Sequence, residues 1–168
     1  MPVSVVLLDT RVHNRKGFNC GVERLDRYLR ERAASDAKKS VSVCYVLIAD
    51  DNPTAVIGYY TLSSASIQLA RLPPGLQPKL PRYPDVPATL IGRLAISAAH
   101  RGNRFGEQLL LDALSRAHAA RYAIGSAVVI VDAKGEAAAG FYAQYGFERL
   151  TSDPSRLYIP MGTVAKLF

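Results

Sequence analysis

The sequence from 90 to 106 reads LIGRLAI (90–96), SAA (97–99) and HRGNRFG (100–106), and EQLLLDAL (107–114) follows. The first segment is typical of a strand, and the apolar spacing of the last is typical of a helix. The turn between them therefore opens a helix, whose first backbone N–H groups lack intrahelical partners. These amides and the positive end of the helix dipole favour a phosphate. We expect Gly102 and Gly106 to let the backbone approach the phosphate closely, and Arg101 and Arg104 to add cations beside it.

Known nucleotide motifs do not describe this turn. No Gly-Lys-Ser/Thr follows it, and no Gly-x-Gly-x-x-Gly occurs in it, which excludes a Walker loop and a dinucleotide fingerprint. The plain alternative is a strand-to-helix turn that carries surface arginines.

A second informative stretch reads VVIVD (128–132) and then AAAGFYAQYGF (137–147). The first part predicts a central strand, and the second predicts a short helix closed by Gly146. Phe141 and Tyr145 are four residues apart and are expected to share the side that faces the core. Tyr142 is rotated by about 100° from Phe141 and is free to face a cleft. The alternative for Tyr142 is a purely structural ring.

Outward from these stretches, the pattern predicts a mixed α/β sheet with helices on its faces. A helix with an apolar stripe follows Gly21 and ends near Lys38-Lys39. The six prolines between 72 and 87 predict an irregular loop. No linker interrupts 1–168, which we interpret as one domain. We expect a helix at 106–121. The strands at 42–49 and 56–66 are expected to form an antiparallel hairpin. In all, strands are expected at 3–8, 42–49, 56–66, 88–97, 126–132, 147–150 and 157–160.

Composition limits the class of protein. The chain has 168 residues, 49% of them hydrophobic and 21% charged, which is ordinary for a folded domain. We find neither a signal peptide nor an apolar run of membrane-spanning length, and we expect a cytoplasmic protein with no membrane partner. Cys20 and Cys44 are expected to be free thiols, and no metal site is predicted.

The net charge of +7 is concentrated in two segments, 11–39 and 71–104, where Lys and Arg outnumber Asp and Glu. Such a field attracts phosphates of a cofactor or of a nucleic acid. A solvated basic surface is the alternative.

The two quoted stretches together resemble the GNAT superfamily of acyl-CoA N-acyltransferases. The turn 101–106 is similar to its Arg/Gln-x-x-Gly-x-Gly/Ala motif, with Arg104 in place of the middle glycine. The resemblance implies acetyl-CoA as co-substrate, Tyr142 as the general acid, and a mostly antiparallel sheet of about six to seven strands. Arg104 is expected to reach a CoA phosphate. The donor would be held by Leu94, Ala95 and Ile96, by Arg101 to Gly106, and by Asp132, Ala138 and Phe141.

A narrower resemblance covers nearly the whole chain. The segments NCGVERLDRYL (19–29), GYYTLS (58–63), GRLA (92–95), VDA (131–133) and RLYIPM (156–161) are similar to the GNAT toxins of type II toxin–antitoxin pairs. The resemblance implies acetylation of the α-amino group of aminoacyl-tRNA, a homodimer, and a ribbon-helix-helix antitoxin through which alone DNA is bound. Arg93, Arg27, Lys38 and Lys39 are then expected to contact the RNA. Two alternatives are an ordinary GNAT enzyme that acetylates a small amine or protein N-terminus, and a non-catalytic acyl-CoA sensor or RNA-binding module.

Overall fold

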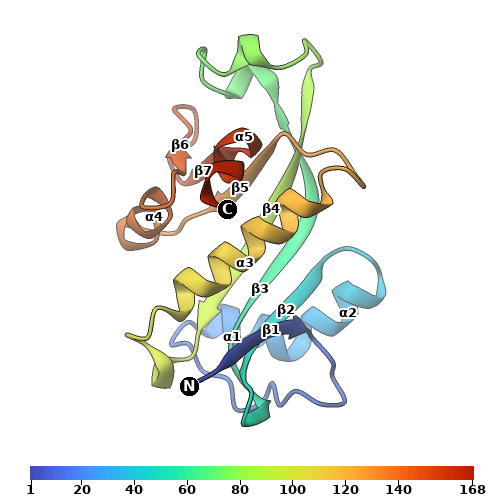
Figure 1. The fold of residues 1–168 in the computed structure, drawn as a ribbon, viewed down its shortest axis with the longest axis vertical. Helices are drawn as coiled ribbons and strands as arrows, with labels where there is room; N and C mark the ends of the chain where they lie inside the picture. The colour runs from blue at the N-terminus through green and yellow to red at the C-terminus, as the bar shows by residue number, and fades with distance from the viewer. The chain divides into compact units, whose positions relative to one another are not determined.

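The computed structural model describes residues 1–168 and contains one seven-stranded mixed sheet, in the order β1-β2-β3-β4-β5-β7-β6 (Figure 1). The pairs β1–β2, β2–β3, β5–β7 and β6–β7 are antiparallel, and β4–β5 is parallel. The predicted mixed, mostly antiparallel sheet is therefore confirmed. The strands are β1 (Val3–Leu7), β2 (Val43–Ala49), β3 (Asn52–Gln68), β4 (Asp85–Ile96), β5 (Val128–Asp132), β6 (Glu148–Arg149) and β7 (Arg156–Pro160).

Five α-helices and four short 3₁₀ helices connect the strands. None of these helices is both long and apolar enough to cross a membrane. The helices are α1 (Glu23–Glu31), α2 (Ala33–Lys38), α3 (Phe105–Ala120), α4 (Glu136–Ala143) and α5 (Met161–Val164), with η1 (Leu69–Arg71), η2 (Gln77–Lys79), η3 (Ala98–His100) and η4 (Ala165–Leu167).

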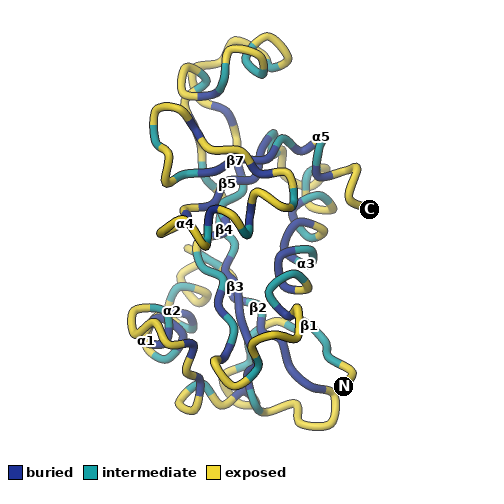
Figure 2. The backbone as a smooth tube through the Cα atoms, turned by 90° about the vertical axis from the view of Figure 1, so that its left-hand side faces the viewer, coloured by how far each residue is buried: buried dark blue, intermediate teal, exposed yellow.

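The chain forms two compact units. The first unit comprises Met1–Ser63 and Gly92–Ala113. Its core is a cluster of buried side chains from β2, β3, α1 and the loop before α1, and Figure 2 shows the buried backbone along β2 and β3. Tyr59 lies at the centre of this cluster, between the rings of Phe18 and Tyr28. Burial of these aromatic rings holds α1 against the sheet.

The second unit comprises Ser64–Ile91 and Leu114–Phe168. Its core joins β5, β7 and the first half of β4 to the proline-rich loop, which buries Leu72 and half-buries Leu76 and Leu80. The loop is therefore packed through its leucines, although its backbone forms only the 3₁₀ helices η1 and η2.

The structure differs from the sequence prediction in one helix and in the lengths of several strands. The single helix expected up to Lys38-Lys39 is broken at Arg32, where φ is −120° and α1 gives way to α2. The guanidinium of Arg15 donates to the carbonyls of Leu29 and Arg30 at this break. These carbonyls thus have a partner from outside the helix. Strands β3 and β4 are longer than predicted, and the tail forms α5 and η4.

Candidate functional site

The turn before α3 contains two residues with left-handed backbone conformations. Gly102 has φ +84° and Arg104 has φ +58°, both in the left-handed region that favours glycine. A Cβ added to Gly102 would meet nothing within 4 Å, so the outer face of the turn is open. The side chain of Arg104 is 87% exposed, and its only ion pair is a 4.0 Å contact with Glu107. The α3 amides and the Arg104 guanidinium therefore remain available to an anion.

Two other polar side chains of the turn hydrogen-bond to the backbone of the protein instead. Arg101 donates from Nη2 to the carbonyl oxygen of Cys20 at 2.6 Å, and Asn103 donates from Nδ2 to the carbonyl of His100 at 3.1 Å. These bonds brace the turn, and the Arg101 bond ties it to the segment before α1. Of the two arginines in the predicted phosphate turn, only Arg104 thus has a guanidinium that makes no hydrogen bond to the protein backbone. Phe105 is buried and Gly106 is half-buried at the start of α3.

The strand leading into the turn loses its parallel partner half-way along. The β4–β5 register ends with Ile91 opposite Val131, so Gly92–Ile96 continues without β5 on that edge. On its other side the segment is pressed against β3, where a Cβ added to Gly58 would lie 2.8 Å from the carbonyl oxygen of Ala95. Leu94 and Ile96 are half-buried and Ala95 is buried. An extended ligand can add to this edge as a strand would.

Arg93 is held by an aromatic ring of α1. Its guanidinium carbon lies 3.5 Å from the centroid of the Tyr28 ring. The Tyr28 hydroxyl in turn donates to Asp36 Oδ2 at 2.7 Å, which fixes the ring. Burial, together with this hydrogen bond, raises the pKa of Tyr28. The ring stays neutral and presents its face to the cation. Tyr28 was not among the expected site residues; the alternation of β4 carries no signal of this contact.

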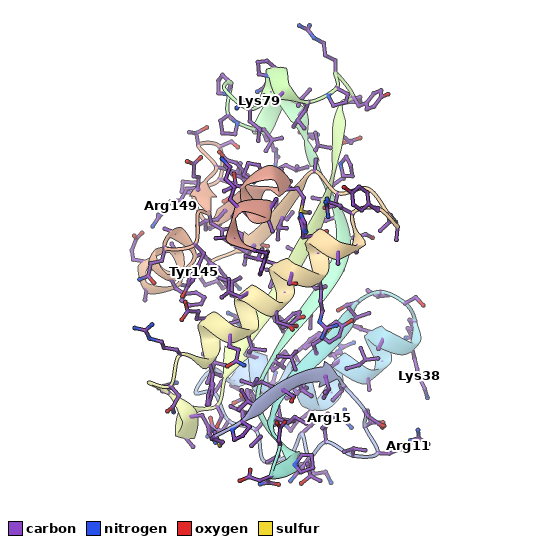
Figure 3. All side chains as sticks on the ribbon, in the orientation of Figure 1. Arg11, Arg15, Lys38, Lys79, Tyr145 and Arg149 are labelled. Atoms are coloured by element: carbon purple, nitrogen blue, oxygen red, sulfur yellow. The ribbon has the colours of Figure 1, made fainter.

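The other expected RNA-binding cations lie on α1 and after it. Arg27 forms an exposed i,i+4 ion pair with Glu23 at 3.5 Å. Lys38 ends α2 and Lys39 follows it; both are exposed and form no ion pair. Figure 3 shows the Lys38 side chain projecting away from α2. The two lysines are thus more readily available to a polyanion than Arg27.

In the second unit, α4 begins after Gly135, which has φ +94°, and the turn that follows α4 ends at Gly146 with φ +101°. The expected left-handed glycine is confirmed at Gly146. Phe141 and Tyr145 are neighbours as expected, with ring centroids 5.4 Å apart, but both are only half-buried. Tyr142 is the buried ring of α4, 7% exposed and edge-on to Phe147. The expectation that Phe141 and Tyr145 share the core-facing side was therefore wrong, because the buried ring is that of Tyr142.

The hydroxyl of Tyr142 forms no hydrogen bond to the protein. Burial raises the pKa of Tyr142 to about 12, so the phenol is fully protonated at neutral pH. An ordinary phenol and an ordinary thiol differ by only about 1.5 pKa units, but with Tyr142 at about 12 the gap is about 3.5 units, or about 5 kcal/mol. Tyr142 is thus suited to donate a hydrogen bond to a leaving thiolate. Full proton transfer to that thiolate is less favourable from Tyr142 than from an ordinary phenol.

The remaining predicted donor-binding residues lie at the end of β5 and on α4. Asp132 forms a two-pronged ion pair with Arg156, at 2.8 and 3.0 Å. Its carboxylate therefore serves β5–β7 pairing, and Arg156 is a partner that the sequence did not indicate. Ala138 is half-buried on α4. Cys20 and Cys44 are both free thiols, as expected, and no three His, Cys, Asp or Glu side chains gather as a metal site.

Solved structures of known proteins resemble this fold over its full length. AtaT complexed with acetyl-methionyl-tRNAfMet superposes with a TM-score of 0.91 at 28% identity and covers 99% of both chains. AtaT bound to the C-terminus of the antitoxin AtaR, AtaTR bound with acetyl-CoA and a KacTA–DNA complex give TM-scores of 0.85, 0.85 and 0.82 at 25%, 28% and 27% identity. Each covers 99% of this chain and 98% of the other.

Curated relatives agree with the structural neighbours. A probable toxin TacT of Sinorhizobium fredii is 33% identical over 95% of this chain and 92% of its own length. A tRNA-acetylating toxin of Mycobacterium tuberculosis is 34% identical over 86% of this chain and 84% of its own length. The acetyltransferase (GNAT) domain family matches residues 41–149. Together with the open turn and the unpaired edge of β4, these matches show that this chain belongs to the GNAT family of acetyl-CoA-dependent N-acetyltransferases.

Proposed function

We propose that this protein is a toxin that transfers the acetyl group of acetyl-CoA to the α-amino group of aminoacyl-tRNA and so blocks translation. One observation carries the proposal. The general family match begins at residue 41, whereas the TacT relative matches 95% of the chain and so includes most of the basic segment before it. That segment holds Arg27, Lys38 and Lys39. The likeness to this toxin relative, and to the AtaT structure complexed with acetyl-methionyl-tRNAfMet, which covers 99% of this chain, therefore includes the region suited to an RNA backbone.

The residues present fit acetyl-CoA, which supplies an activated acetyl thioester. Leu94, Ala95 and Ile96 offer backbone groups on the unpaired edge of β4 to an extended pantetheine arm. The first amides of α3 and the exposed guanidinium of Arg104 hold the pyrophosphate, while Arg101 and Asn103 keep the turn in shape. Asp132, Ala138 and Phe141 complete the donor side in this proposal, Asp132 by fixing the end of β5 through Arg156.

Tyr142 is the proposed catalytic residue. Its protonated hydroxyl donates a hydrogen bond to the sulfur that leaves as the new amide forms. The acceptor needs little help from a base, because an α-amino group has a pKa of about 7.7–8.0 and is partly neutral at pH 7. The side-chain ammonium of a lysine, with a pKa near 10.4, is mostly protonated at that pH. This difference favours α-amino groups as acceptors.

The acceptor RNA is proposed to lie against Arg93, Arg27, Lys38 and Lys39. Arg93 is oriented by Tyr28, so its guanidinium is placed before the RNA arrives. Lys38 and Lys39 supply unpaired charge for backbone phosphates.

We further propose that the toxin works in the cytoplasm as a homodimer and is neutralised by a ribbon-helix-helix antitoxin through which it is tethered to DNA. AtaT bound to the C-terminus of the antitoxin AtaR and the KacTA–DNA complex support the antitoxin and DNA parts of this proposal. Copurification of the toxin with the product of an adjacent small gene, followed by an operator-binding assay with and without that product, tests it.

The central experiment incubates the protein with labelled acetyl-CoA and either charged or deacylated total tRNA. Label is expected on charged tRNA only and is expected to fall steeply in Tyr142→Phe. The matched control is Tyr122→Phe, because Tyr122 is 85% exposed and lies outside the proposed site. Transfer to small amines or peptide N-termini with charged tRNA ignored would contradict the proposal and favour an ordinary acetyltransferase.

A further inference from the structure

A basic cleft in the first unit includes none of the residues assigned above to binding acetyl-CoA or RNA. It lies between the loop that follows β1 and the end of α1, with a volume of about 340 Å³. Its lining includes Thr10, His13, Arg15, Lys16 and Arg30, with Glu31 as its one carboxylate. Figure 3 labels Arg15 in this region. The cleft is therefore dominated by hydrogen-bond donors.

The buried member of this lining is His13, which is only 7% exposed. Its Nδ1 accepts a hydrogen bond from the backbone N–H of Asp9 at 3.0 Å. Because Nδ1 is an acceptor here, the ring proton of the neutral imidazole is on Nε2. No group of the protein accepts from Nε2. His13 thus presents a fixed donor without a partner at the wall of the cleft.

The cations beside His13 are not neutralised by carboxylates, with one exception. Arg15 donates only to the carbonyls of Leu29 and Arg30, and Lys16 forms no ion pair. Arg30 is the exception, at 3.3 Å from Glu23. Two unmatched cations and a fixed N–H donor outweigh the single rim carboxylate of Glu31. An anion with several acceptor oxygens satisfies this set better than water does.

We infer that the cleft binds a backbone phosphate of the substrate RNA, with His13 Nε2–H, Arg15 and Lys16 as its donors. The inference rests on the proposed function, which supplies a polyanionic acceptor. It adds a contact on the loop after β1, separate from Arg27, Lys38, Lys39 and Arg93. A phosphodiester has the oxygen acceptors that the imidazole N–H, guanidinium and ammonium require.

The test compares Lys16→Gln and His13→Leu with the wild type for binding of deacylated tRNA across a salt series. A lost phosphate contact weakens binding and makes the slope of log K against log salt shallower by about one. Lys16→Gln is the primary variant because Lys16 is exposed, so we expect the substitution to leave the fold intact. His13→Gln is expected to recover part of the loss in His13→Leu, since its amide can both accept from Asp9 and donate into the cleft. Lys166→Gln, which changes charge outside both basic segments, is the control and is expected to match the wild type.

A second arm titrates inorganic phosphate and follows the imidazole nitrogen signals of the three histidines by NMR. A saturable shift of the His13 signals that Lys16→Gln weakens supports the cleft as an anion site. Unchanged tRNA affinity and salt slope in the variants would overturn the assignment to RNA, even with a phosphate shift, and would leave a free phosphate as occupant. Failure of the wild type to acetylate charged tRNA would instead count against the proposed function. The phosphate titration would still show whether the cleft binds an anion.

Discussion

At the scale of single residues, the chemistry of Tyr142 depends on one oxygen atom. Replacement by Phe leaves the contacts of the ring with Phe141 and Phe147 in place. We expect the melting temperature of Tyr142→Phe to stay near that of the wild type, and kcat to fall by about 100-fold or more, the usual contribution of a general acid. The KM for acetyl-CoA should change little. Steady-state kinetics and thermal unfolding of the same preparation check this. A clear fall in the melting temperature together with the fall in kcat would point to a structural role for the Tyr142 hydroxyl.

The raised pKa of Tyr142 also fixes the shape of the pH–rate profile. With a pKa of about 12 the phenol keeps its proton throughout the accessible range. We expect kcat/KM for charged tRNA to rise as the acceptor amine loses its proton and then to stay level up to about pH 10. A wild-type profile that descends around pH 9–10 would show that the acid titrates lower than its burial implies.

Arg104 combines a strained backbone with an exposed cation. A residue with a Cβ in the left-handed region costs about 1–2 kcal/mol relative to a right-handed conformation, and glycine avoids this cost. Arg104→Gly is therefore expected to keep the turn but to lose the guanidinium. We expect the Kd for acetyl-CoA to rise about tenfold, as for one charge-assisted hydrogen bond. Isothermal titration measures it, and binding as tight as in the wild type would mean that the backbone amides suffice.

At the scale of elements, the break between α1 and α2 depends on a residue outside both helices. Arg15 donates to Leu29 and Arg30 carbonyls at 3.5 and 3.3 Å, long but charge-assisted bonds. Arg15→Met is expected to lower the free energy of unfolding by about 1 kcal/mol, because two carbonyls lose a donor. Urea denaturation measures this. Arg11→Met is the control, since that side chain is 91% exposed, and equal losses in both variants would refute the capping role.

The same break explains where the sequence prediction succeeded and failed. Apolar spacing places α1 and the hairpin β2–β3 correctly, because these elements follow from local periodicity. The end of α1 could not be found this way, since its determinant is Arg15, 14 and 15 residues from the carbonyls it contacts. The sequence predicted the turn before α3 through Gly102, but it could not show that Arg101 would hydrogen-bond back to Cys20. It missed His13 because a lone histidine carries no signal until its hydrogen bond to Asp9 is known.

At the scale of the whole molecule, both units bury weakly acidic side chains, namely cysteine thiols and a tyrosine phenol. Burial raises the pKa of Cys44 to about 12 and of Cys20 to about 11 in the first unit, and of Tyr142 to about 12 in the second. Each of these groups is more acidic in the unfolded chain than in the folded protein. Their contribution to stability is therefore complete below the unfolded pKa and is lost as pH rises toward the folded value.

At Cys44, the dependence of stability on pH can be measured for a single buried thiol. The side chain is 2% exposed, and its thiol would titrate near 8.5 in the unfolded chain. The free energy of unfolding should thus fall between about pH 9 and 11, by about 1.4 kcal/mol per pH unit for each such group. Cys44→Ser removes the titrating thiol, so its slope should be shallower by that amount, whatever its stability at pH 7. Urea unfolding between about pH 7.5 and 10.5 measures both slopes, with Tyr122→Phe as an exposed control. Parallel slopes in wild type and Cys44→Ser would mean that the thiol titrates alike in both states.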